Sequence, residues 1–297
     1  PGCRLHSLAC ATGLHAQKWA KRFQADACST DYKELLKDPA LDAVFITTRH
    51  HLHKAMALDA IAAGKHVFVE KPLALTTEAC EEICDAAQKQ GVLLAVGFNR
   101  RFAPLSLRAQ QLFSGTKQAH LLLYRCNAGA LPPDHWALDP LQGGGRILGE
   151  AVHFFDYACW FFQDVPRTIQ AECAAPAQRG KGIDSVSVSL LFSRGALATV
   201  LYTGDGSSLL EKEYIEIHGT ESSLTIHDFK QLTPYGIGAG KITARRIDKG
   251  HTSLITHFIR AIQGHEALSV SGEDGRLATY IAEETLRQIN AFHKDTL

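Results

Sequence analysis

Three polar clusters, each at the end of an apolar run in the first hundred residues, carry side chains that could bind a ligand and move a proton. They are Thr48-Arg49-His50, Glu70-Lys71-Pro72 and Phe98-Asn99-Arg100. Lys71 is the first candidate for general acid–base chemistry, because partial burial or a neighbouring positive charge lowers a lysine pKa toward the working pH. Taken alone, Lys71 could equally be a solvated charge at a turn, so its role depends on where the fold places it.

The segments that carry these clusters alternate between strand and helix patterns. Continuous apolar runs at residues 43–48, 66–70 and 92–97 predict strands that are buried on both faces. A shorter strand is expected at residues 4–9. Helices are expected through Gln17, Trp19 and Phe23, at 32–36, at 52–63 before Gly64, and from Thr76 or Thr77 to Gly91.

This alternation predicts an α/β fold with a doubly wound sheet. Strands that are joined through single helices pair in parallel by right-handed crossovers, which produces a Rossmann-type sheet. Such sheets bind their ligands beyond the carboxyl ends of the strands. All three polar clusters follow strands at that edge, so we expect them to converge on one site.

The pattern changes near Lys117. Six segments with strand character follow, at 119–126, 168–173, 185–192, 196–202, 213–218 and 223–227. Their alternation and their glycine turns predict a large, mostly antiparallel sheet. Helices are expected at 147–162, 253–262 and 274–292. We therefore predict a Rossmann domain at residues 1–116 and an α+β domain at residues 117–297.

Composition excludes several classes of protein. The 31 basic residues balance the 31 acidic residues, so no charge pattern favours nucleic acid or an anionic membrane, and no apolar run reaches the length of a membrane-spanning helix. The eight cysteines form no C-x-x-C pair, and His50, His51 and His53 have no acidic or thiol neighbours, so no metal is expected. Reduced cysteines that pack as small apolar side chains favour a cytoplasmic protein.

Three longer motifs stand in order along the chain. They are AVFITTRHHLHKAMALDAIAAGKHVFVEKPLALT at 43–76, GGGRILGEAVHFFD at 143–156 and GEDGRLATYIAEETL at 272–286. Together they resemble the Gfo/Idh/MocA family, the relatives of glucose–fructose oxidoreductase and inositol dehydrogenase, over nearly the whole chain. The resemblance implies an enzyme that uses NAD or NADP and transfers a hydride between the nicotinamide and a secondary alcohol of a sugar, polyol or sugar nucleotide.

The resemblance also implies roles for two residues. Lys71 would move the proton of the reacting hydroxyl, and His153 would carry a proton or hold the substrate near Lys71, although a lone histidine on that helix could belong to the core. The expected cofactor residues are Thr48, Arg49, His50, His53, Glu70, Lys71 and Asn99. The expected substrate residues are Arg100, Arg101, Trp136, Glu150, His153 and Asp156. For the arginines and Trp136, a structural role is the alternative.

The sequence departs from the family pattern in two places. Many members have an aspartate one turn before the motif histidine, where this chain has Gly149; Glu150 is adjacent but points to another part of the helix. The G-x-G-x-x-G phosphate loop is not found, and Cys10-Ala11-Thr12-Gly13 stands where an acidic residue would bind the ribose, which leaves NAD and NADP undecided. Because residues 4–9 correspond to the second strand of a Rossmann unit, we expect about thirty further residues upstream, and some look-alikes continue there into another oxidoreductase domain.

Two other functions fit the same fold. One is NAD-dependent glycoside hydrolysis, in which a transient oxidation activates elimination. The other is a catalytically silent sensor or co-repressor that binds dinucleotide, against which the intact Lys71 and His153 argue. The second sheet is expected to leave one face with alternating apolar positions open, in strands such as 185–192, and we expect a homodimer or homotetramer to form through it.

Overall fold

The first hundred residues form two parallel sheets in place of the single sheet predicted. The computed structural model describes residues 2–114, 118–174 and 185–295. The elements of the first part are β1 (Ser7–Ala9), α1 (Gly13–Phe23), β2 (Ala27–Ser29), α2 (Tyr32–Leu36), β3 (Ala43–Ile46), η1 (His50–Leu52), α3 (His53–Ala62), β4 (His66–Val69), α4 (Thr77–Gln90) and β5 (Leu94–Val96). Strand β1 pairs with β2, a second sheet has the order β3-β4-β5, and every pairing is parallel.

The split between the two sheets has a geometric reason. In a Rossmann fold, the strand before the glycine-rich loop lies between the strands to which β1 and β3 correspond. The described residues contain no strand at that place, so β1 and β3 belong to separate sheets. Strand β2 was not predicted because it is only three residues long and its Ala27 and Cys28 are exposed, so it shows no apolar run.

Local signals place the elements around β4 and β5 as predicted. Val67, Phe68 and Val69 are buried, as the continuous apolar run requires. Helix α4 begins after Thr76, whose hydroxyl oxygen accepts a hydrogen bond from the Ala79 amide at 3.1 Å. It ends at Gly91, which adopts a left-handed conformation with φ 71°. These caps fix the two ends of α4, and with them the positions of the polar clusters that follow β4 and β5.

The second part of the chain builds one large sheet. Its elements are η2 (Asn99–Phe102), α5 (Pro104–Leu112), β6 (Ala119–Asn127), η3 (Trp136–Leu138), η4 (Ile147–Ala151), α6 (Val152–Phe162), β7 (Pro166–Cys173), β8 (Ser185–Phe192), β9 (Leu197–Thr203), β10 (Glu213–Gly219), β11 (Ser222–His227), β12 (Gln231–Tyr235), β13 (Ile242–Thr243), α7 (His251–Ile262) and α8 (Gly272–Asp295). The strand order is β13-β12-β11-β10-β6-β9-β8-β7, and all pairings are antiparallel except that of β6 with β9. The predicted boundary at residues 116 and 117 lies outside the described residues.

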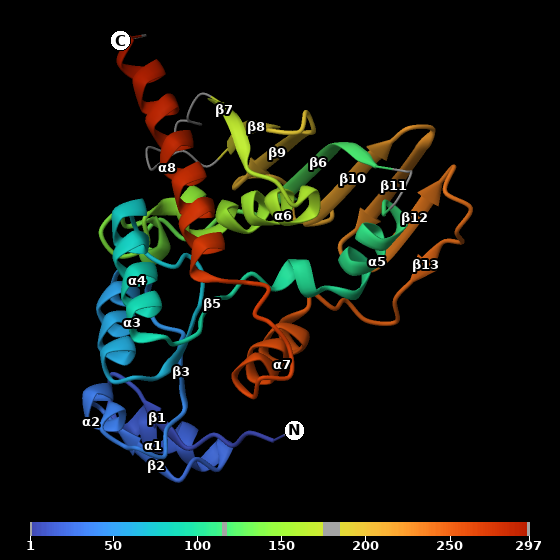
Figure 1. Ribbon diagram of the computed structural model, residues 1–297. Coiled ribbons are helices and arrows are strands. Elements are labelled where there is room, and N and C mark those ends of the chain that lie inside the picture. The colour runs from blue at the N-terminus through green and yellow to red at the C-terminus, as the bar shows by residue number, and fades with distance from the viewer. Residues whose placement is uncertain (1, 115–117, 175–184, 296–297) are drawn as a thin grey trace.

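One face of this sheet is buried under helices, as Figure 1 shows for α6. In β8 the buried positions are Val186, Val188, Leu190 and Phe192, and the alternate positions are three serines and Leu191. The prediction that β8 would offer its apolar positions to the open face is therefore wrong, because those side chains fill the core beneath the helices. On the open face the half-buried and exposed leucines come mainly from neighbouring strands and include Leu121, Leu123 and Leu201.

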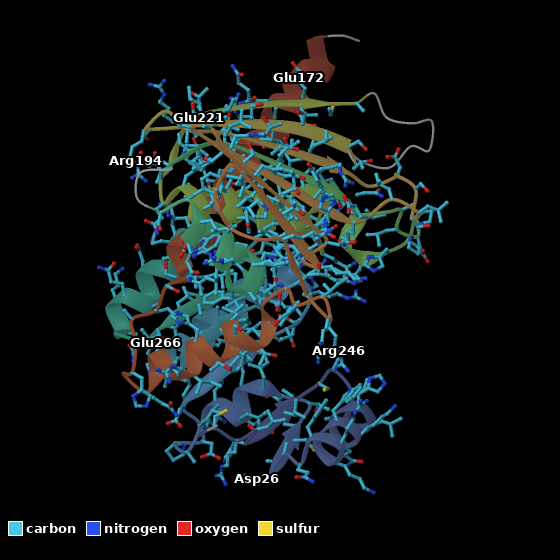
Figure 2. The ribbon with its side chains drawn as sticks, turned by 90° about the vertical axis from the view of Figure 1, so that its right-hand side faces the viewer. Asp26, Glu172, Arg194, Glu221, Arg246 and Glu266 are labelled. Atoms are coloured by element: carbon cyan, nitrogen blue, oxygen red, sulfur yellow. The ribbon has the colours of Figure 1, made fainter. Side chains whose placement is uncertain are left out.

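The last two helices join the two parts of the molecule. Helix α8 packs against α4 of the first part and against α6 and β7 of the second. The Phe258 ring of α7 contacts the Phe45 and Phe68 rings of the β3-β4-β5 sheet. Figure 2 shows Asp26 and Glu172 at opposite ends of the molecule, with the junction between them. No helix in the described part of the chain is long and apolar enough to span a membrane.

Candidate active site

The Lys71 side chain stands at the junction, directly after β4, and reaches the second part of the chain. Its ammonium donates a hydrogen bond of 2.7 Å to the carbonyl oxygen of Gly149. Gly149 lies in η4, a π-helical turn, where a regular α-helix was predicted. Such turns occur frequently at functional sites because they reposition backbone groups and side chains. The turn thus presents a backbone acceptor to the proposed proton-transfer group.

Gly149 also explains the departure from the family aspartate. A Cβ atom at this position would lie 3.1 Å from Cε1 of His50, closer than side chains ordinarily pack. The His50 ring is held there by a contact of 2.7 Å between its Nδ1 and the Gly143 carbonyl oxygen. The space beside residue 149 is therefore occupied by His50, and the missing Cβ allows that approach.

The environment of Lys71 favours its neutral form more than water does. Burial lowers the pKa of Lys71, and the positive charges of Arg100 and Lys212 lower it further, while the Glu70 and Glu150 carboxylates oppose the change. Glu70 accepts a hydrogen bond of 3.3 Å from the Lys71 amide and lies against Gly97, the residue after β5. A lysine in these surroundings can exchange a proton at a lower pH than a solvated one.

His153 lies at the start of α6 and is buried, with 6% of its surface exposed. Within the described residues, its Nδ1 atom has no hydrogen-bond partner. Burial, together with the charges of Arg100 and Lys71, holds the pKa of His153 well below its ordinary value. The ring is therefore neutral, and an unpartnered buried nitrogen is available to a ligand.

The carboxylate of Glu150, a predicted substrate residue, is bonded to protein groups. Its Oε1 accepts a hydrogen bond of 2.9 Å from Lys212, and its Oε2 accepts one of 2.7 Å from the Tyr202 hydroxyl and pairs with Arg146 at 3.3 Å. Burial alone would raise the pKa of Glu150, but these partners outweigh it and lower the pKa. The carboxylate is ionised and occupied by protein groups.

Arg101 and Asp156, two predicted substrate residues, contact each other in the structure. Both side chains are buried and form a bidentate ion pair, and Arg101 also pairs with Asp274 at 3.0 Å. Burial raises the pKa of Asp156 to about 7, which the Arg101 guanidinium opposes. These groups join η2, α6 and α8 across the junction, and their polar atoms face one another.

Arg100, also a predicted substrate residue, has a buried carboxylate partner as well. Its guanidinium forms hydrogen bonds of 2.6 and 2.9 Å with the two oxygens of Glu213, at the start of β10. Burial would raise the pKa of Glu213, but Arg100 and Lys249 lower it to about 2. Arg100 acts on the site through its charge, which lowers the pKa of both Lys71 and His153.

Of the histidines near β3, His53, a predicted cofactor residue, is bonded to backbone through both ring nitrogens. It is fully buried, its Nδ1 lies 2.7 Å from the Pro72 carbonyl oxygen, and its Nε2 lies 3.1 Å from that of Thr48. Both ring nitrogens are thus occupied by backbone at the ends of β3 and β4. Thr48 itself is exposed at the edge of the sheet and remains a predicted cofactor residue.

The loop before the glycines is tied to η1. The Trp136 ring stands edge-on to the His50 ring, with the two centroids 4.8 Å apart. The Arg49 guanidinium lies 5.7 Å from the centroid of the Trp136 ring. Arg49 also donates to the Gln142 side chain. Burial lowers the pKa of His50 to about 4, so this histidine is neutral in the folded chain. The role of Trp136 as an aromatic wall stays a prediction.

Asn99 follows β5 and is buried, and its side-chain amide nitrogen donates a hydrogen bond to the Lys249 carbonyl oxygen at 2.7 Å.

Three groups near the site were not predicted at all. Tyr202, Lys212 and Arg146 reach Glu150 from β9, from the residue before β10 and from the residue before η4, respectively. No motif marks them, because each is an isolated residue in its own segment.

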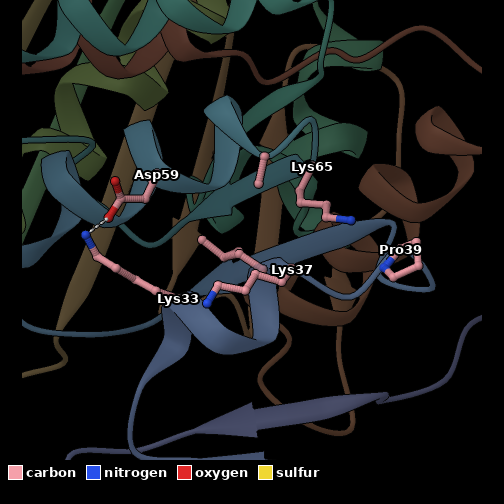
Figure 3. Close-up of a pocket in the computed structure, with 7 residues that line it drawn as sticks. Lys33, Lys37, Pro39, Asp59 and Lys65 are labelled. Carbon is pink, nitrogen blue, oxygen red and sulfur yellow. Dashed lines mark ion pairs between the residues drawn. The ribbon is translucent and has the colours of Figure 1, made fainter.

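A separate hollow, shown in Figure 3, lies at the other end of the β3-β4-β5 sheet. Lys33, Lys37 and Lys65 line it together with Pro39 and Asp59. Lys33 pairs with Asp59 at 3.0 Å, and Lys65 donates to the Asp38 carbonyl oxygen at 2.8 Å. Since Pro39 and Lys65 precede β3 and β4, this hollow belongs to the amino ends of the strands and not to the candidate site.

The residues at the carboxyl ends of β3, β4 and β5 fit the nicotinamide half of a dinucleotide. They are the exposed Thr48, the Glu70 carboxylate and Lys71, and helix α6 adds the orphaned nitrogen of His153. The turn from β1 to α1 is capped by the Thr12 side chain and contains no G-x-G-x-x-G segment, nor do the other described residues. No group of three or more potential metal ligands gathers within the described ranges.

A parallel sheet with a polar carboxyl edge, joined to a large mostly antiparallel sheet, defines a two-domain oxidoreductase with an NAD-binding Rossmann domain. The model of the "Oxidoreductase family, NAD-binding Rossmann fold" matches residues 5–98, and that of the "GFO/IDH/MocA C-terminal domain" matches residues 117–225. The chain belongs to the GFO/IDH/MocA oxidoreductase family, as the motifs predicted.

Individual relatives support this assignment. The chain is 31% identical over 267 residues to 1,5-anhydro-D-fructose reductase of Ensifer adhaerens, which covers 85% of this chain and 79% of the relative. It is 27% identical to myo-inositol 2-dehydrogenase of Thermotoga maritima over 87% of this chain and 81% of the relative. The structure of levoglucosan dehydrogenase in complex with NADH and levoglucosan superposes with a TM-score of 0.84 at 24% identity, covering 97% and 88% of the two chains, and shows the shared fold.

Proposed function

We propose that this enzyme transfers a hydride between NAD or NADP and a secondary alcohol of a sugar or polyol, and that Lys71 moves the hydroxyl proton. The observation that carries the proposal is the Lys71 ammonium, held by the Gly149 carbonyl at 2.7 Å beside the neutral, buried His153. The names of the relatives, which refer to reduction or oxidation of sugars and inositols, agree with this substrate class.

The residues of the chain divide the work as follows. Thr48, Glu70 and Asn99 would hold the nicotinamide end of the cofactor, which supplies or accepts the hydride when bound. Burial lowers the pKa of Lys71. Its amine takes the proton from the substrate hydroxyl during oxidation and returns it during reduction. The Gly149 carbonyl aims the Lys71 amine. His153 binds the same hydroxyl or a neighbouring one through its free nitrogen.

The test is the Lys71→Ala variant, assayed for NAD(P)H formation with a panel of sugars and inositols. General acid–base assistance contributes about 10²–10⁴-fold in rate, so kcat should fall by at least the lower bound while cofactor affinity, measured by fluorescence titration, stays nearly unchanged. Lys230→Ala, at an exposed lysine of the second domain, is the matched control. Normal turnover by Lys71→Ala would overturn the assignment of Lys71, whereas failure of the unaltered chain to turn over any sugar or inositol would favour a dinucleotide-binding sensor.

A nitrophenyl glycoside separates simple hydride transfer from the glycosidase alternative. Release of nitrophenol that requires the oxidised cofactor would favour hydrolysis through transient oxidation. Hydride transfer without nitrophenol release supports the dehydrogenase. The same assays, run in both directions with NAD and NADP, identify the cofactor preference.

We also propose a homodimer or homotetramer that pairs through the open face of the large sheet. Leu121, Leu123 and Leu201 give this face an apolar component, and burying such surface favours association. A monomeric mass by light scattering at micromolar concentration would contradict this. The described cysteines other than Cys173 are free thiols, which fits the reducing cytoplasm that we propose as the location.

A further inference from the structure

Two successive residues of η4 hold two different ammonium groups. The Gly149 carbonyl oxygen accepts the hydrogen bond of Lys71 at 2.7 Å, and the Glu150 carboxylate accepts that of Lys212 at 2.9 Å. One turn of backbone therefore places a second lysine beside the proposed proton-transfer group. The charge of Lys212 contributes to lowering the pKa of both Lys71 and His153, which agrees with this proximity.

The bonds of Glu150 determine which of the two partners can meet a ligand. Its carboxylate oxygens are taken by Lys212, Tyr202 and Arg146. An ammonium has three N–H donors, and among the described residues Lys212 directs one of them, to Glu150. The Lys212 side chain is 42% exposed. The cation, and not the carboxylate, is the member of this pair that is free to bind.

Cations outnumber carboxylates in the ion pairs of Glu150 and Glu213, although the whole chain is neutral. Four cations pair with two carboxylates: Arg146 and Lys212 with Glu150, and Arg100 and Lys249 with Glu213. Two of these cations, Arg100 and Lys212, act on Lys71 through their charge, which favours an anionic group beside them, although Glu70 and the Asp228 carboxylate that accepts from the Lys212 amide offset part of this charge.

Exposure distinguishes among the four cations. The side chains of Arg146, Arg100 and Lys249 are 4%, 8% and 21% exposed, against 42% for Lys212. The first three are committed to the interior, where they neutralise buried carboxylates. Lys212 is the one of these four that can donate to a molecule entering from solvent.

We propose that Lys212 binds an anionic substituent of the substrate, a carboxylate or a phosphoryl group on the sugar, and that Glu150 is the positioning residue that holds Lys212. This inference rests on the proposed function, since it names the substrate class of the same site. Lys212 directly precedes β10 of the second domain and contacts the turn that holds Lys71, and for this reason the proposal places the anion on the molecule whose hydroxyl Lys71 serves.

Calorimetric titration of the full chain with D-glucuronate, D-glucose 6-phosphate and D-glucose, with and without NADH or NADPH, tests the proposal. We expect at least one anion to bind tighter than glucose, and Lys212→Met to weaken that anion about tenfold or more, as for a hydrogen bond to a charged group. Binding of glucose should change less than about twofold. The better of the two anions identifies the substituent as carboxylate or phosphoryl.

Three comparisons make the result specific to the Lys212 charge. Lys212→Arg should keep the preference for the anion, and Glu150→Gln should weaken it without changing glucose binding. Lys230→Met, at an exposed lysine of the same domain, should match the unaltered chain. A further comparison uses the unaltered chain alone. Raising the salt concentration from about 0.05 M to about 0.5 M should weaken the binding of the anion and leave the binding of glucose unchanged.

Equal affinity for charged and neutral sugars, failure of every anion to bind, or anion binding that Lys212→Met leaves unchanged would each overturn the inference. None of these results affects hydride transfer to a neutral sugar. Conversely, Lys212-dependent anion binding without hydride transfer to any sugar would overturn the proposed function and leave the anion site standing.

Discussion

Lys71 and Gly149 meet across the domain junction: the ammonium at the end of β4 donates to a backbone carbonyl of η4 at 2.7 Å. A backbone carbonyl has no charge to gain or lose, so this contact orients Lys71 over the whole working pH range. A carboxylate in the place of this carbonyl would orient Lys71 through its charge only while the carboxylate is ionised. The proton affinity of Lys71 is then set by burial and by the charges around it.

The pH dependence of oxidation should report this arrangement. Lys71 must be neutral to accept the hydroxyl proton, so kcat/KM for alcohol oxidation should rise with pH through the lowered pKa of Lys71. The positive charge of Lys212 contributes to that lowering, and Lys212→Met should therefore move the rising limb to higher pH. Lys230→Met should leave it in place. A limb that stays fixed or moves to lower pH in Lys212→Met would contradict the role of Lys71.

Gly149→Ala should destabilise the chain by about 1–3 kcal/mol, the usual cost of overpacking. The added Cβ lies 3.1 Å from His50, so either the ring or η4 has to move. Removing the ring with His50→Ala should relieve part of this cost, and urea unfolding of the two single variants and the double variant measures the coupling. Additive effects of the two substitutions would show that His50 is not the neighbour that excludes a side chain at this position.

Arg101→Met should cost about 3–5 kcal/mol of unfolding free energy, because it leaves the buried Asp156 carboxylate without its partner. The control is Arg287→Met, which removes an exposed arginine paired with Glu284 on the surface of α8 and should change stability little. Both are measured by urea unfolding at neutral pH. Equal losses in the two variants would show that the buried pair contributes no more than a surface pair.

Stability should also fall when the solution becomes mildly acidic. The pKa of His50 is about 4 in the folded chain against an ordinary 6.5, so the unfolded chain binds this proton more readily. The stabilisation is complete above 6.5 and is lost as the pH falls toward 4. The loss between about pH 7 and about pH 5 should be smaller in His50→Gln, and unchanged in the exposed His265→Gln. A His50→Gln loss as large as that of the unaltered chain would contradict this.

The parts of the site that sequence predicts are those carried by continuous motifs. Lys71 follows a strand with a continuous apolar run, and His153 lies within the glycine-rich motif, so both could be predicted as candidates. Lys212 and Tyr202 could not, because they stand 62 and 52 residues away from Glu150 and only the sheet brings them together. The same limit applies to Arg100 and Arg101, whose buried partners lie on elements distant in sequence.

The fold shows the same division. Strand and helix types followed from periodicity and caps, and the parallel and antiparallel regions were predicted correctly. The π-helical turn was predicted as ordinary helix, since one extra residue in a turn barely alters an apolar pattern. Strands β12 and β13 were missed, because Pro234 interrupts the first and the second has two residues.

The contact of Phe258 with the β3-β4-β5 sheet has a consequence for how the protein is made. A ribosome releases that sheet long before it releases α7, and α8 emerges last of the three. Until then the Phe68 ring lacks a neighbour that covers it in the finished molecule, and α4 lacks its contact with α8. The nucleotide-binding part therefore cannot complete its folding early, because α7 and α8, which cover it, come late in the chain. A nascent chain halted after the first hundred residues would present apolar surface to chaperones.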